Sequence, residues 1–168
     1  RTTWIDAGIS THPLATSGGY IYSHENGPND GQPLGAAPVA MSSYIESSFM
    51  DIADGEFYML TKRVIPDVDF TASQTTNPVT GATLVPAVDM SVAVTKFPGA
   101  ATATTDVAGT TLTRNVVTAA STIDQYTDQV FIRARGRQMS FKISSNTLGT
   151  QWQLGDTRVD AKPDGMRG

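Results

Sequence analysis

The sequence contains no cysteine and only two histidines, and each shortage removes a class of site. Without cysteine the chain can form neither a disulfide nor a thiolate metal site. His12 and His24 do not lie at the spacing of paired ligands, so they support neither a zinc site nor a hydrolase triad. No apolar run approaches the roughly 18 residues of a transmembrane helix, and no apolar segment of a secretory signal opens the chain.

Charge is also sparse, since only 17% of the residues are charged and the net charge is −4. A dedicated nucleic-acid-binding protein needs a basic surface, so we expect no specific binding to nucleic acid, although DNA can still pass along the molecule. Threonine, serine, alanine, valine and glycine are abundant, and 15 Gly with 9 Pro favour short strands and many turns. At 168 residues the chain is long enough to bury roughly 70% of its unfolded surface.

Residues 128–165 carry the clearest local pattern, in which apolar and polar side chains alternate with a period of two. Apolar residues stand at alternate positions from Val130 to Ala134, and Phe131, Arg133 and Arg135 occupy the opposite face. The alternation resumes after Gly136 and again after residue 151. Three such runs joined by polar turns predict an antiparallel meander with an apolar side and a cationic side.

The rest of the chain predicts further strands. Residues 41–52 and 56–70 are expected to pair as a hairpin around Ala53-Asp54-Gly55, and residues 88–95 give the cleanest alternation. Residues 100–120 contain almost no large side chains, so we expect a loop that orders only against a partner, with a short strand near residues 115–118. The fold class is therefore an all-β antiparallel sandwich or meander with long loops and no substantial helix.

Domain organisation is expected to be simple. We interpret residues 1–168 as a single β-rich domain, or as one domain with an extension, because the length suits one domain and no internal repeat is present. The sequence opens at Arg1 without a methionine and enters at once into a strand-like segment. We therefore expect the chain to be a piece of a longer polypeptide, in preference to a processed chain.

Candidate catalytic and metal-binding patterns are weak. Asp67 and Asp69 are better explained as the solvated face of a strand than as a general acid and base. The segment from His24 to Gly31 is rich in oxygen ligands but lacks the spacing and the terminal glutamate of a calcium loop. No nucleophile elbow or phosphate-binding glycine loop is present. We therefore predict no catalytic, cofactor-binding or metal-binding residue, and a protein that is not an enzyme.

The one concentration of charge is Arg133, Arg135, Arg137, Lys142 and Arg158. Arginine pairs bidentately with carboxylates and phosphates, so this set could meet an acidic neighbouring subunit or phosphates. It could equally be a solvated strand face whose long side chains cover their cross-strand neighbours. Arg133, Arg135, Arg137 and Arg158 are the candidate subunit-contact residues.

Several motifs resemble the C-terminal end of large virion proteins of short-tailed bacteriophages, of the tail-nozzle or tail-tubular kind. The motifs are Ser43–Ser48, Asp54-Gly55, Arg63–Asp67, Arg135–Met139, Leu148–Gly155 and Arg158–Arg167. The resemblance covers roughly the two ends of the chain and contains no catalytic signature. It implies a non-enzymatic structural subunit of a phage tail, without cofactors, that forms part of a ring or tube with copies of itself and with other virion tail proteins.

The alternative from a different class is a carbohydrate-binding or adhesin-like β-sandwich. Such a module needs a cluster of exposed aromatic side chains, on which sugar rings can stack. Tyr20, Tyr22 and Tyr44 are the only candidates in the sequence.

Overall fold

The computed structural model describes residues 3–6, 8, 10–30, 36–95, 104–105, 111–112 and 116–166. Within these residues the chain is almost entirely β-structure, and its one helical segment is a single 3-10 turn, η1, at Ala53–Gly55. The predicted all-β fold class is confirmed. Across the described ranges, no helix has the length and apolar character needed to cross a membrane.

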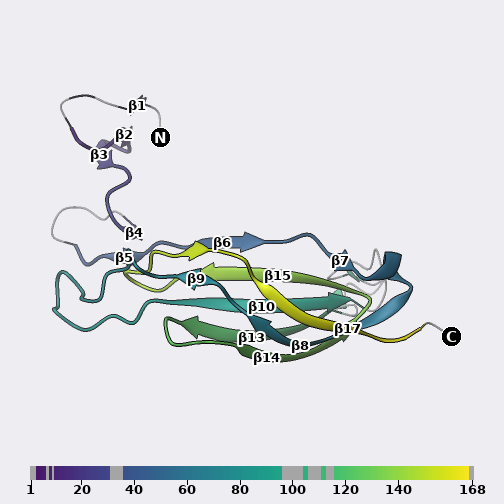
Figure 1. The fold of residues 1–168 in the computed structure, drawn as a ribbon. Coiled ribbons are helices and arrows are strands. Elements are labelled where there is room, and N and C mark those ends of the chain that lie inside the picture. Colours follow the sequence, from purple (N-terminus) through teal and green to yellow (C-terminus); the bar gives the residue numbers. More distant parts are fainter. Residues whose placement is uncertain are drawn as a thin grey trace.

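Two antiparallel sheets pack face to face as a β-sandwich (Figure 1). The first sheet has the strand order β13-β10-β15-β6. β6 pairs with the second half of β15, and β7 pairs with the beginning of β15. The second sheet has the order β14-β8-β17. Their bounds are Ser43–Glu46 (β6), Met50–Asp51 (β7), Phe57–Ile65 (β8), Ala87–Thr95 (β10), Val116–Asp124 (β13), Val130–Gly136 (β14), Gln138–Ser145 (β15) and Arg158–Met166 (β17).

The inner faces of the two sheets form one hydrophobic core. Every second residue of β10 from Val88 to Val94 is at most 2% exposed, whereas Asp89 between them is exposed. The opposite sheet contributes Val64 of β8 and Ile132 of β14. Full burial of such a side chain stabilises a fold by about 1.5–3 kcal/mol. The inward faces predicted for residues 88–94 and 130–134 are thus confirmed.

The connection at Gly136 differs from the prediction. The expected meander would pair β14 with β15, but β14 pairs with β8 and β15 pairs with β10, so the chain crosses from one sheet to the other. A Cβ atom on Gly136 would lie 2.7 Å from the backbone oxygen of Thr95 in β10. Glycine therefore lets the chain pass directly over β10, and the next amide, of Arg137, donates to that same Thr95 oxygen at 2.7 Å.

A second expected hairpin is also wrong. β7 pairs with β15 in the first sheet, whereas β8 lies in the second sheet, so Ala53–Gly55 is a crossing between sheets and not a hairpin turn. Asp54 and Gly55 both have positive φ, which turns the chain sharply enough to change layer. The predicted strand over residues 41–52 is broken into β6 and β7.

Smaller ladders close one end of the sandwich. β9 (Val68–Asp69) pairs with β16 (Gln153–Leu154), and β4 (Asn29–Asp30) pairs with β5 (Val39–Ala40). β8 ends just before Pro66, as expected for a residue that cannot donate to a ladder. The Asn29 side chain accepts a hydrogen bond from the Gly149 amide at 2.6 Å, which fastens the N-terminal segment to the sandwich.

The first strands form a separate three-stranded sheet, β1 (Thr3–Ile5), β2 (Leu14–Ser17) and β3 (Tyr20–Ser23), called here the N-terminal sheet. It lies apart from the sandwich (Figure 1). Ala15 is the one hydrophobic side chain that is fully buried in it, within the described residues. Trp4 packs its ring against His24 at 4.8 Å between centroids but is still 53% exposed.

The segment expected to be a partner-dependent loop, residues 100–120, lies largely outside the described residues. Two short strands of it, β11 (Thr104–Thr105) and β12 (Thr111–Leu112), pair with each other. Its last residues belong to β13, which begins at Val116 and pairs with β10 along nine residues. The short strand expected near residues 115–118 is thus confirmed in position. The observed strand is longer than expected, because β13 continues to Asp124.

Candidate functional site

Positive charge gathers on the outer face of the β14-β8-β17 sheet. The three strands carry six of the eight lysines and arginines that the structure describes, and only two acidic side chains, Asp160 and Asp164. We call this surface the cationic face, and its members are Lys62, Arg63, Arg133, Arg135, Arg158 and Lys162.

Strand register explains why these side chains share one face. Arg63 stands opposite both Phe131 of β14 and Asp160 of β17, and directly opposed residues point to the same side of a sheet. Thr61 and Val64 point inward and are 0% exposed. A β-bulge between these two inward residues leaves both Lys62 and Arg63 on the outer side.

Two of the cations are paired within the face. Arg135 Nε donates to Asp164 Oδ2 at 2.5 Å, and the Arg135 guanidinium lies 4.5 Å from the centroid of the Tyr58 ring. Arg63 lies 3.7 Å from the carboxylate of Asp160. All four charged side chains are 40–52% exposed, so each pair contributes only about 0–1 kcal/mol to stability.

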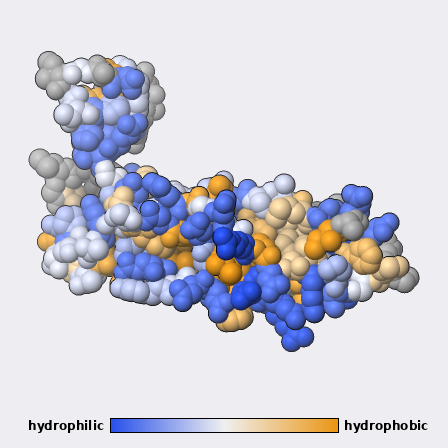
Figure 2. Space-filling view, viewed as in Figure 1, coloured by the Kyte–Doolittle hydropathy of each residue, from blue (hydrophilic) through white to orange (hydrophobic). Residues whose placement is uncertain are grey.

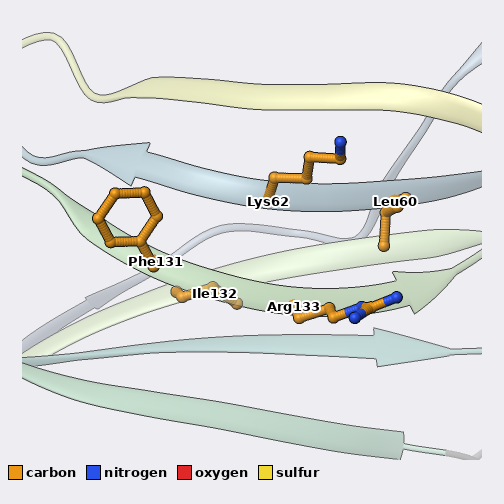
Figure 3. Close-up of a pocket in the computed structure, with 5 residues that line it drawn as sticks. All are labelled: Leu60, Lys62, Phe131, Ile132 and Arg133. Atoms are coloured by element: carbon orange, nitrogen blue, oxygen red, sulfur yellow. The ribbon is translucent and has the colours of Figure 1, made fainter.

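The remaining four cations of this face have no ion-pair partner among the described residues: Lys62, Arg133, Arg158 and Lys162. Lys62 and Arg133 flank a shallow hollow with Phe131, whose ring is 75% exposed (Figure 3). Strongly hydrophilic side chains lie beside hydrophobic ones across the middle of the sandwich (Figure 2). This surface therefore combines a net positive charge with an exposed aromatic ring.

The structure brings together three of the four candidate arginines. Arg133, Arg135 and Arg158 lie on the cationic face. Arg137 does not: it follows the Gly136 crossing, is half-buried, and donates to the backbone oxygen of Gly55. It thereby joins the two sheet crossings, which is a structural role.

Lys142 lies on the opposite sheet, where it stands opposite Glu46 at 3.5 Å and above the Tyr44 ring.

Sequence reasoning missed Lys62, Arg63 and Lys162. The bulge at residues 62–63 breaks the alternation that revealed Arg133 and Arg135. Placing β8 between β14 and β17 also requires pairing over long sequence separations, which one sequence does not reveal. The sequence nevertheless contains a local signal for Lys162, because Arg158, Asp160 and Lys162 alternate with apolar Val159 and Ala161.

The two aspartates considered for acid–base chemistry have structural partners instead. Asp67 accepts a hydrogen bond from the Asp156 amide at 3.1 Å. Asp69 accepts hydrogen bonds from the hydroxyl and the backbone amide of Thr71, and these bonds, the hydroxyl first, lower its pKa. Within the part of the chain that the structure describes, no group of three or more metal-ligating side chains is found.

The three tyrosines of the alternative interpretation do not form one platform. Tyr20 and Tyr22 are neighbours on the N-terminal sheet, with ring centroids 6.5 Å apart in an edge-on arrangement. Tyr44 lies on β6 of the sandwich, beneath Lys142. A flat cluster that could stack on a sugar chain is therefore not assembled from these residues.

No protein-family model matches the chain, and no curated protein sequence gives a significant match.

Proposed function

We propose that this chain is a non-enzymatic structural subunit of a bacteriophage virion, part of a nozzle-like ring or tube in the tail. It would contact copies of itself and other virion tail proteins. The sequence motifs that resemble tail-nozzle and tail-tubular proteins suggest this placement. The observation that carries the proposal is the cationic face, a broad outer surface with an exposed phenylalanine and four positive side chains that have no ion-pair partner in the described part of the chain.

The architecture supports a mechanical role. A sandwich whose strands are mostly seven to nine residues long is a stiff body, because each long strand is fixed by hydrogen bonds on one or both sides and by the shared core. In a ring such bodies would hold the diameter of the lumen while outer faces provide the contacts. The net charge of −4 would let DNA pass without being retained.

The direct test is the assembly state of the purified chain. Sedimentation velocity over a concentration series, followed by electron microscopy of the largest species, should show closed rings or short tubes of one diameter. Measurement in 50 mM and in 500 mM NaCl separates contacts made by charged faces from hydrophobic aggregation, since only the former weaken with salt. A monomer at every concentration and at both salt levels would contradict the proposal.

A further inference from the structure

The outer face of the other sheet carries the opposite charge. Strands β6, β7, β10, β13 and β15 contain four acidic side chains and one basic side chain. Register places Glu46, Asp89 and Asp124 outward, because their neighbours Ile45, Val88 and Ile123 belong to the inner side. We call these three residues, with the exposed ring of Tyr44, the acidic face.

The two faces also differ in the length of their side chains. The cationic face projects lysines and arginines, whereas the centre of the acidic face is built from short residues such as Ser91, Ala120 and Ser144. Long cationic side chains from outside could therefore reach its carboxylates. Tyr44 is 67% exposed and its ring centroid lies 4.7 Å from Lys142 Nζ of the same sheet, so an aromatic ring suited to cation contact stands beside these carboxylates.

We propose that the cationic face of one copy binds the acidic face of the next copy. This inference rests on the proposed function and assigns the surfaces that would build the ring. The faces lie on opposite sides of the sandwich, so the contact is head-to-tail, and such contacts generate rings when the rotation between copies closes.

The charge of the chain favours a second copy over a nucleic acid as the partner of the cationic face. The complementary acidic surface is present on the same chain, while the net charge of −4 opposes the approach of a polyanion.

Two charge-reversed variants test the contact. The first, Lys62→Glu/Arg133→Glu, leaves four basic and four acidic side chains on the cationic face and so removes its net positive charge. The second, Glu46→Lys/Asp89→Lys, makes both faces cationic. Lys62 and Arg133 have no ion-pair partner among the described residues, so reversing them removes no internal pair. Docking loses its charge complementarity in the first variant and brings like charges face to face in the second, so each variant alone should need about tenfold or more protein to assemble.

An equimolar mixture of the two variants should recover assembly. In an alternating array every second contact joins the two unaltered faces, and the other contacts join the introduced glutamates to the introduced lysines. The matched control for the second variant is Asp6→Lys/Glu25→Lys, which makes the same change in net charge outside the sandwich sheets and should assemble like the wild type. Circular dichroism melts of all variants confirm that they are folded. Sedimentation velocity in 50 mM NaCl gives the assembly state.

The outcomes separate this inference from the function on which it rests. A wild type that stays monomeric defeats both. A wild type that assembles while the Glu46/Asp89 variant assembles equally well overturns the inference alone, as does a mixture that fails to recover. If both variants assemble and only the Lys62/Arg133 variant loses binding to a short DNA duplex, the cationic face belongs to nucleic acid and the inference is wrong.

Discussion

The sandwich and the N-terminal sheet are built from similar strands but differ in what those strands bury. Most strands of the sandwich are seven to nine residues long, and thirteen buried hydrophobic side chains among the described residues form its core. β1, β2 and β3 are three or four residues long, and within them Ile5 and Ile21 are 53% and 73% exposed. A short sheet without a core is marginal by itself. Stability should therefore reside in the sandwich, and the N-terminal sheet should contribute little to it.

The largest expected effect comes from truncating the core. Met90 is 0% exposed at the centre of β10, so Met90→Ala should lower the free energy of unfolding by about 2–5 kcal/mol through lost burial and the cavity left behind. The matched truncation in the N-terminal sheet, Ile21→Ala, should change it by less than about 0.5 kcal/mol. Urea unfolding followed by tryptophan fluorescence and circular dichroism measures both. Equal losses would show that the N-terminal sheet shares the stability of the sandwich.

A smaller effect is expected at the sheet crossing. Gly136→Ala would place a Cβ 2.7 Å from the Thr95 oxygen and 2.8 Å from the Val94 Cβ, so backbone must shift at a cost of about 1–3 kcal/mol. Gly8 is the control from the N-terminal segment, because its nearest neighbour would be an Ile5 methyl at 3.9 Å. Thermal melts should show a lowered midpoint for Gly136→Ala and an unchanged midpoint for Gly8→Ala. An unchanged midpoint for Gly136→Ala would mean that the close approach at the crossing is not rigid.

The same crossing shows what a single sequence could and could not predict. Which face of a strand points inward depends on neighbours two residues apart, so the alternation from Val88 to Val94 and from Val130 to Ala134 was read correctly. Which strand lies beside which depends on contacts between distant segments. Gly136 was recognised as a break, but its role depends on Thr95, some forty residues away in the chain.

The candidate site likewise contains residues that a local pattern predicts and residues that only the fold brings together. Arg133 and Arg135 were found because the alternation of β14 is regular. Arg137 was grouped with them by spacing alone, although the crossing at Gly136 turns it toward Gly55. The partners that complete the cationic face come from β8 and β17, whose places beside β14 are fixed by the fold and not by any local pattern.

The smallest expected effect is electrostatic and lies at the end of β13. The hydroxyl of Thr127 donates to Asp124 Oδ1 at 2.8 Å and the amide of Tyr126 donates at 2.9 Å, and these bonds, the hydroxyl first, lower the pKa of Asp124 below its ordinary value of 3.8. Because the folded state favours the ionised carboxylate, this contribution to stability is present above the unfolded pKa and is lost as the pH falls through the folded pKa.

Thr127→Val removes the hydroxyl and should raise the Asp124 pKa, which carbon-detected NMR of the carboxyl group follows directly. The variant should also lose slightly less stability than the wild type between pH 7 and acid, since it has less of the contribution to lose. Thr16→Val in the N-terminal sheet is the control, because no carboxylate accepts from its hydroxyl among the described contacts. It should leave the acid dependence unchanged. If the two substitutions alter that dependence equally, the acid response is not a local property of the sandwich, and the Asp124 pKa is set by something other than Thr127.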